Sequence, residues 1–100
     1  MKTVLVGGAS KGLGYGCAHM LAAQGHTVVM CARSSGELET AAKQIAAATG
    51  SRTIPIPCDL SSREALAALA QQLAGLSIEI DILVNNVGGP KAALVTELTE

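Results

Sequence analysis

Short apolar runs alternate along the chain with longer stretches in which apolar residues recur every three or four positions. Four runs, at residues 2–6, 27–31, 53–56 and 80–84, have the length and composition of β-strands. The stretches between them have the periodicity of amphipathic helices. The first of these helices is predicted over residues 12–24, with apolar positions at Leu13, Cys17, Met20 and Leu21.

Capping signals refine the later helices. Ser34 with Glu37, and Ser61 with Glu64, have the spacing of capping boxes, in which a hydroxyl and a carboxyl group cap the first turn. They predict one helix from residue 34 to about residue 49 and another from residue 61. A further helix is expected to begin at about Pro90 or Lys91 and to continue to the last residue.

This alternation of strands and helices predicts a parallel sheet with right-handed crossovers. The expected fold class is α/β, a Rossmann-like doubly wound sheet of about four strands with flanking helices. Pro55 interrupts the third run and favours an edge strand, because proline cannot donate a ladder hydrogen bond. The outer flank of the fourth strand is expected to remain an open edge. No linker or repeat divides the chain, so one domain is expected over residues 1–100.

Composition and charge exclude several classes of function. Apolar residues make up 49% of the chain, but with no Trp, no Phe and one Tyr they favour a sheet covered by helices over an aromatic-rich sandwich. The net charge is −1 and the basic residues are scattered, so neither a nucleic-acid surface nor a membrane anchor is predicted. No apolar run reaches the ~18 residues that a membrane-spanning helix needs.

The cysteines and histidines predict neither disulfide nor metal chemistry. Cys17, Cys31 and Cys58 are odd in number and lack C-x-x-C spacing, which is typical of buried thiols in a cytoplasmic protein. His19 and His26 have no carboxylate or cysteine at a spacing that favours a metal site.

A glycine-rich turn joins the first strand to the first helix. Gly8, Gly12 and Gly14 follow the pattern G-x-x-x-G-x-G, which matches neither G-x-G-x-x-G nor the phosphate loop of nucleotide-hydrolysing enzymes. Glycine is needed where a Cβ would block a tight turn and the close approach of a ligand. A strand, a glycine turn and a helix N-terminus together present N–H groups to a diphosphate, so a nucleotide cofactor is predicted. The alternative is a purely structural turn.

The end of the second strand favours NADP(H) over NAD(H). A dinucleotide site usually has an acidic residue there to hold the ribose 2′-hydroxyl, whereas this chain has Arg33. A guanidinium can hold a 2′-phosphate bidentately, while Lys11 adds a second positive charge and Ser34 a hydroxyl. The alternative is that Arg33 and Lys11 are ordinary surface charges.

Two further strand ends belong to the same edge of the predicted sheet. Asp59, after the third strand, can accept a hydrogen bond from an adenine amino group or can form the turn before the next helix. Asn85 and Asn86 follow the fourth strand, at the carboxyl edge where open α/β sheets bind ligands. Alternatively, they only satisfy backbone groups in a bend.

Taken together, these motifs resemble the short-chain dehydrogenase/reductase family over the whole chain. The matches are the glycine turn, the pair Asp59 and Leu60, and residues 81–88, which are similar to the family's N-N-A-G motif with Val87 in place of alanine. The chain looks most like compact members such as 3-oxoacyl-[acyl-carrier-protein] reductases. Gly7 departs from the family, which usually has a threonine there that braces the turn.

The resemblance implies a role for individual residues. Ser10, Lys11, Gly12 and Leu13 would contact the cofactor's phosphates and ribose, and Arg33 would select the 2′-phosphate. Asp59 and Leu60 would lie next to adenine, and Asn86 and Gly88 would line the path toward nicotinamide. The residues predicted to bind NADP(H) are Gly8, Ser10, Lys11, Gly12, Leu13, Gly14, Arg33, Ser34, Asp59, Leu60, Asn86, Val87 and Gly88.

The resemblance also implies that the catalytic half is absent. The family uses a Y-x-x-x-K pair with a serine, but the one tyrosine here, Tyr15, lies beside the glycine turn and is followed four residues later by His19. We therefore expect the truncated, cofactor-binding half of an NADP(H)-dependent oxidoreductase, with no catalytic residue among these 100. The full-length protein is expected to be a cytoplasmic homo-oligomer that acts on a small carbonyl or alcohol substrate, with neither nucleic acid nor membrane as a partner.

Three alternatives stay open at this point. The first is a non-catalytic NADP(H)-binding module, which a downstream Y-x-x-x-K would argue against. The second is an S-adenosylmethionine methyltransferase, for which Arg33 is unsuitable because that cofactor needs an acidic residue at the end of the second strand. The third is an inactive fragment, which predicts weak thermal cooperativity and no response to cofactor.

Overall fold

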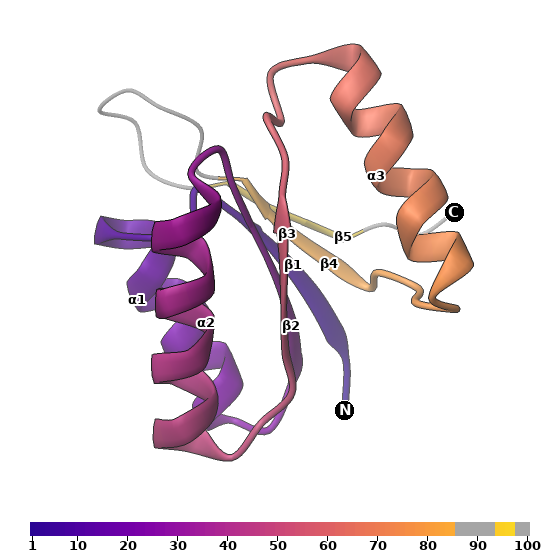
Figure 1. The fold of residues 1–100 in the computed structure, drawn as a ribbon. Helices are drawn as coiled ribbons and strands as arrows, with labels where there is room; N and C mark the ends of the chain where they lie inside the picture. Colours follow the sequence, from indigo (N-terminus) through magenta and orange to yellow (C-terminus); the bar gives the residue numbers. More distant parts are fainter. Residues whose placement is uncertain (86–93, 98–100) are drawn as a thin grey trace.

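Helices and strands alternate along the chain as far as the fourth strand. The computed structural model describes residues 1–85 and 94–97. Over this part of the chain it contains five strands and three helices (Figure 1). In chain order these are β1 (Thr3–Gly7), α1 (Gly12–Ala23), β2 (Thr27–Ala32), α2 (Ser35–Thr49), β3 (Thr53–Pro57), α3 (Arg63–Gly75), β4 (Ile82–Asn85) and β5 (Leu94–Glu97).

The strands form one sheet in the order β3-β2-β1-β4-β5. Strand β1 lies between β2 and β4 and runs parallel to both, with Leu5 opposite Val29 on one side and Leu83 on the other. Strand β3 runs parallel to β2 at the edge of the sheet, which confirms the edge position predicted from Pro55. Four parallel strands with flanking helices confirm the predicted α/β, Rossmann-like class.

Strand β5 differs from the sequence-based prediction. In place of a helix, residues Leu94–Glu97 form a strand antiparallel to β4, with Val95 opposite Val84. Val95 and Thr96 are β-branched, and such residues lose side-chain freedom in a helix but fit a pleated sheet. The helix prediction for this segment is wrong because β5 pairs with the flank of β4 that the sequence pattern left open.

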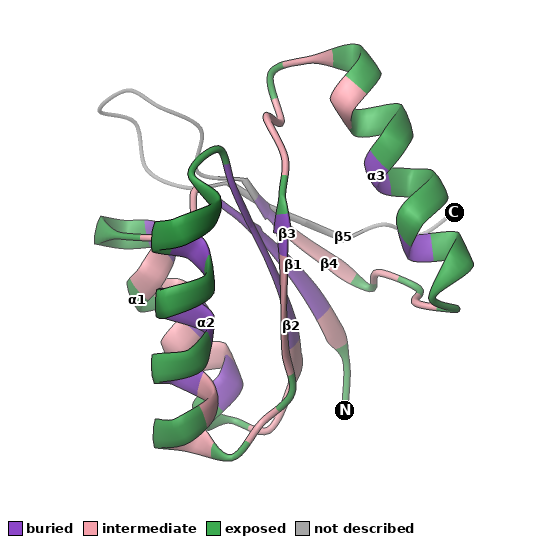
Figure 2. Ribbon diagram, viewed as in Figure 1, coloured by how far each residue is buried: buried purple, intermediate pink, exposed green. Residues whose placement is uncertain are grey.

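Alternating side chains of the strands divide the core into two layers. One layer joins the sheet to α1 and α2, and its large members are Val4, Val6, Val28, Met30, Leu38, Ile45 and Val84. The other joins the sheet to α3 and consists of Leu5, Val29, Cys31, Ile56, Leu69 and Leu73. Figure 1 shows α1 and α2 on one side of the sheet and α3 on the other, and Figure 2 shows buried residues concentrated in β1 and β2. Buried central strands hold the loops at their carboxyl ends in fixed positions.

Helix α1 buries a different face from the one predicted. Leu13 and Met20 are 54% and 55% exposed, whereas the buried residues of α1 are Gly14, Ala18 and Ala22. Small side chains allow the helix axis to approach the sheet closely, so the larger apolar residues face away from it. Cys17 and Leu21, the other two predicted positions, are partly buried against the core.

The predicted capping boxes are only partly correct. Ser34 does precede α2, but its side chain makes no capping hydrogen bond. The N-cap of α3 is Ser62, whose hydroxyl oxygen accepts a hydrogen bond from the Ala65 N–H at 3.2 Å. Ser61, the predicted cap, bonds instead to the carboxylate of Asp59. Because two serines are adjacent, the sequence alone does not show which one caps the helix.

Candidate functional site

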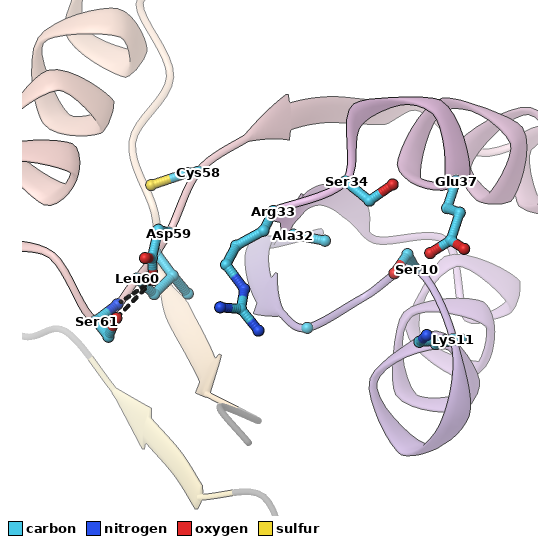
Figure 3. A pocket seen from close by; sticks show the side chains of 11 residues that line it. Ser10, Lys11, Ala32, Arg33, Ser34, Glu37, Cys58, Asp59, Leu60 and Ser61 are labelled. Carbon is cyan, nitrogen blue, oxygen red and sulfur yellow. Dashed lines mark hydrogen bonds between the residues drawn. The ribbon is translucent and has the colours of Figure 1, made fainter.

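A cavity of about 670 Å³ lies where the carboxyl ends of β1, β2 and β3 meet. Each strand contributes the loop that follows it, so residues far apart in the sequence line one space (Figure 3). This is the edge at which open parallel sheets bind ligands. The lining residues are Gly8, Ser10, Lys11, Ala32, Arg33, Ser34, Glu37, Cys58, Asp59, Leu60 and Ser61.

The glycine turn after β1 has a geometry that only glycine adopts easily. Gly8 and Gly12 have φ angles of 64° and 65°, in the left-handed region that L side chains rarely occupy. A Cβ built on Gly14 would overlap the carbonyl oxygen of Gly8, whereas one built on Gly12 would meet nothing within 4 Å. Gly14 therefore allows the helix to approach the turn, and Gly12 leaves open space beside it.

Helix α1 begins in this turn without a side-chain cap. Its N-cap residue is Lys11, no capping hydrogen bond comes from a side chain, and the first turn contains no acidic residue. The first amide N–H groups of a helix lack intrahelical acceptors, and they lie at the positive end of the helix dipole. The start of α1 therefore has the donors and the polarity that a diphosphate needs, and the glycine turn leaves room for it.

The loop after β2 brings a positive charge into the cavity. Arg33 is exposed, and Figure 3 shows its guanidinium between Leu60 and the glycine turn. Ser34 and Glu37 line the neighbouring part of the cavity, with Ser10 and Lys11 across from them. Because the Ser34 side chain does not cap α2, its hydroxyl is available to a ligand. The positive charges of Arg33 and Lys11 and the hydroxyls of the two serines fit an anionic substituent such as a phosphate.

The loop after β3 is organised around Asp59. Its carboxylate accepts hydrogen bonds from the Ser61 N–H at 3.0 Å and from the Ser61 hydroxyl at 2.6 Å. These bonds, with a contribution from the positive charge of Arg33, lower the pKa of Asp59 below its usual range. Asp59 thus forms the turn before α3 and lines the cavity at the same time. The turn role considered for it from sequence is therefore observed, and the hydrogen bond to adenine stays a prediction.

The two cysteines near this loop are protonated thiols at neutral pH. Burial raises the pKa of Cys31 to about 12, with a smaller contribution from Cys58. Burial and the neighbouring Asp59 also raise the pKa of Cys58, whose thiol lies 3.6 Å from the Ala65 carbonyl oxygen. Since the thiolate is the reactive form, neither cysteine has the character of a nucleophile.

Most of the residues predicted to bind cofactor converge on this cavity. Gly12, Leu13 and Gly14 are in the first turn of α1 beside it, although they do not line it. Asn86, Val87 and Gly88 lie outside the described residues. The predicted residues that line the cavity are Gly8, Ser10, Lys11, Arg33, Ser34, Asp59 and Leu60.

Sequence reasoning missed Ala32, Glu37, Cys58 and Ser61 as lining residues. Glu37 was recognisable only as half of a capping box, although it lies in the first turn of the helix that begins just after Arg33. Cys58 directly precedes Asp59, so the strand-end argument that selected Asp59 could have included it.

Tyr15 and the histidines do not contribute to this cavity. The Tyr15 hydroxyl donates to the side-chain oxygen of Gln44 on α2 at 3.3 Å, and its ring lies 6.3 Å from that of His19. Within residues 1–85 and the short strand β5, no group of three His, Cys, Asp or Glu side chains could hold a metal ion. In the same part of the chain, no helix is long and apolar enough to cross a membrane.

Comparisons with known proteins show the family of the chain. The family model described as short chain dehydrogenase matches residues 2–100. An uncharacterised oxidoreductase of Mycobacterium tuberculosis is 42% identical over 89 residues, which are 87% of this chain and 26% of that protein.

Two solved structures share the fold. RhlG of Pseudomonas aeruginosa, in a complex with NADP, has a TM-score of 0.80 and 39% identity over 88% of this chain and 35% of its own. L-sorbose reductase of Gluconobacter frateurii, complexed with NADPH and L-sorbose, has a TM-score of 0.83 and 29% identity over 90% of this chain and 34% of its own.

The chain therefore spans about a quarter to a third of the length of these relatives. The family model nevertheless covers nearly every residue of the chain. The fold, the glycine turn and this match lead to one conclusion: the chain belongs to the short-chain dehydrogenase family.

Proposed function

We propose that residues 1–100 form the NADP(H)-binding part of a short-chain oxidoreductase. The observation that carries this proposal is the convergence of Arg33, Ser34 and Lys11 on one cavity beside the uncapped start of α1. A dinucleotide with a 2′-phosphate needs two anion sites, one for the diphosphate and one for the extra phosphate. The cavity offers a separate set of donors for each.

Each group has a defined task in this proposal. The N–H groups of the glycine turn and the start of α1 hold the diphosphate, with Ser10 and Lys11 beside them. Arg33 and Ser34 hold the 2′-phosphate, while Asp59 and Leu60 border the adenine. Asn86, Val87 and Gly88 are predicted to continue the site toward the nicotinamide.

The cofactor, when bound, supplies hydride chemistry, and these residues bind and orient it. Tyr15 hydrogen-bonds to Gln44, and His19 stands four residues after it where the family has lysine, so we assign it no catalytic role. We infer that the full-length protein transfers hydride between the nicotinamide and a carbonyl or alcohol substrate. A 3-oxoacyl substrate, a homo-oligomeric state and a cytoplasmic location stay predictions.

A second candidate is a non-catalytic module that binds NADP(H). Within these 100 residues the one tyrosine, Tyr15, hydrogen-bonds to Gln44 and is followed four positions later by His19, so the groups described here are those that a binding module needs. The two candidates differ in one sequence feature, the presence of that pair in a longer reading frame.

Titration of the chain with NADPH and with NADH tests the binding that both candidates require. Fluorescence of the reduced nicotinamide reports binding without interference, because the chain contains no tryptophan. We expect saturable binding of both cofactors, tighter for NADPH, with that difference lost in Arg33→Ala. A folded chain that binds neither cofactor would contradict the proposal.

A further inference from the structure

The cavity contains two carboxylates in different environments. Asp59 is held by two hydrogen bonds from Ser61. Glu37 belongs to the first turn of α2 and is exposed. Among the side chains drawn in Figure 3, hydrogen bonds join only Asp59 and Ser61, and Glu37 reaches from α2 toward Ser10. Glu37 is therefore the carboxylate that is available to a ligand.

Glu37 lies on the side of the cavity that Ser34, Ser10 and Lys11 line, across from the Arg33 guanidinium, which points toward Leu60 (Figure 3). It follows Ser34 by three residues, and it lines the cavity with Arg33 and Lys11. With Ser10 and Lys11 it also lines an adjoining hollow of about 410 Å³. The helix start favours a negative charge here even without a ligand, since first-turn carboxylates interact favourably with the helix dipole.

A carboxylate and a guanidinium at one ribose site favour opposite ligands. Arg33 attracts a 2′-phosphate, whereas a carboxylate repels it and accepts a hydrogen bond from a free 2′-hydroxyl. Lys11 adds positive charge, but Glu37 faces the same space and offsets part of it, as Asp59 does beside Arg33. The net charge around the ribose is therefore less positive than Arg33 and Lys11 alone would make it.

We propose that Glu37 is a specificity-determining residue that lowers the preference of this site for a 2′-phosphate. The inference rests on the proposed nucleotide-binding function and specifies it further: the site accepts cofactors with and without the 2′-phosphate and discriminates only modestly between them. Arg33 sets the direction of the preference, and Glu37 limits its size.

Two small nucleotides test this inference without any catalytic activity. Adenosine 2′,5′-bisphosphate and adenosine 5′-phosphate differ only in the 2′-phosphate, and calorimetric titration gives the affinity ratio of the two. We expect Glu37→Gln to raise the ratio in favour of the bisphosphate by about three- to tenfold at low ionic strength, because the site is partly solvated. Glu37→Lys should raise it further.

Glu39 provides the matched control. It is exposed on the same helix two residues later, and it does not line the cavity. Glu39→Gln and Glu39→Lys change the net charge by the same amounts as the Glu37 variants. They therefore separate the effect of a charge inside the cavity from the effect of the net charge of the chain. We expect both to leave the ratio nearly unchanged.

The possible outcomes distinguish a failure of the role of Glu37 from a failure of the proposed nucleotide-binding function. The role of Glu37 is supported if the affinity ratio rises in Glu37→Gln and rises further in Glu37→Lys, while both Glu39 variants keep the wild-type ratio. If wild type binds both nucleotides but the Glu37 variants keep its ratio, or the Glu39 variants shift it equally, the role of Glu37 is refuted while nucleotide binding stands. If folded wild type binds neither nucleotide, the proposed function fails, and this inference fails with it.

Discussion

Helices α1 and α3 both begin at the carboxyl edge of the sheet, but their first turns are completed in opposite ways. Ser62 caps α3 by accepting from the Ala65 N–H, and Glu64 places a negative charge in the first turn. The loop before α3 is also held by the Asp59–Ser61 bonds. Helix α1 begins at Lys11, with no side-chain cap and no acidic residue in its first turn.

This difference shows how a helix start can be adapted either to stability or to binding. Every helix start has amide N–H groups that need acceptors. In α3 the chain itself supplies an acceptor for these N–H groups, so a bound ligand would add little stability there. In α1 the groups are left to solvent, and a bound anion would satisfy them. A ligand at α1 should therefore also raise the stability of the folded chain.

The largest expected effect is that of Gly14→Ala, which attacks the turn that positions the start of α1. The new Cβ would overlap the carbonyl oxygen of Gly8, and backbone atoms cannot move aside as a flexible side chain can. We expect a loss of about 2–3 kcal/mol in the free energy of unfolding. Urea unfolding followed by far-UV circular dichroism measures it, and cofactor binding should be lost with the turn geometry.

Gly16→Ala is the control for this prediction. Gly16 is in the same helix and is exposed, and a Cβ there would meet nothing within 4 Å. Alanine at that position should stabilise the helix by about 0.5–1 kcal/mol. Equal destabilisation by both substitutions would show that crowding against Gly8 is not the cause.

A substitution at Lys11 makes α1 resemble α3. Lys11→Ser supplies a capping hydroxyl, whereas Lys11→Ala removes the same charge without adding a cap. We expect the serine variant to be more stable than the alanine variant by about 1 kcal/mol. It should also bind NADPH more weakly than the alanine variant does, because the hydroxyl competes with the diphosphate for the same N–H groups.

Thermal unfolding and cofactor fluorescence on the two Lys11 variants measure these differences. Each variant has lost the same positive charge, so their difference isolates the cap. Identical NADPH affinities in two variants of different stability would show that the amides of this turn do not hold the diphosphate.

Much of this arrangement could be predicted because it is local in sequence. The strands have clear apolar runs, and the spacing of the glycines predicts the backbone geometry of the first turn. Arg33 was found because it directly follows a strand, and Asp59 because it lies two residues after one. The buried face of α1 could not be found in this way, since Gly14, Ala18 and Ala22 give a weaker hydrophobic signal than the exposed Leu13 and Met20.

Features that depend on distant partners were less predictable. Strand β5 forms by pairing with β4, and the stabilisation from this pairing cannot be inferred from residues 94–97 alone. The capping role passes to Ser62 because Asp59 engages Ser61, a competition between neighbours that spacing alone does not resolve. Glu37 fits a capping box by position, yet its side chain lies at the cavity, because the direction of a side chain depends on the surrounding fold.

Removal of the cap of α3 should have a smaller effect, confined to stability. Ser62→Ala leaves the Ala65 N–H without its acceptor, and we expect a loss of about 1 kcal/mol in the free energy of unfolding. Nucleotide affinity should stay at its wild-type value, because Ser62 does not line the cavity. Urea unfolding and NADPH titration of the same preparation test both statements. A loss of NADPH affinity in Ser62→Ala would contradict the proposal that the start of α1 binds the cofactor while the start of α3 only stabilises the fold.

The smallest expected effect concerns pH and the loop before α3. The pKa of Asp59 lies below its ordinary value of 3.8, chiefly because Ser61 donates two hydrogen bonds to the carboxylate. A carboxyl group whose pKa is lowered by folding stabilises the folded state above its unfolded pKa, and this contribution is lost as the pH falls through the folded pKa. Wild type should therefore have a higher melting temperature than Asp59→Asn at about pH 7, and the difference should shrink as the pH falls below 3.8 and through the folded pKa. The asparagine still accepts from the Ser61 N–H, so the comparison isolates the charge. A difference that stays constant over this range would mean that the turn depends on the shape of the side chain at position 59 and not on its ionisation.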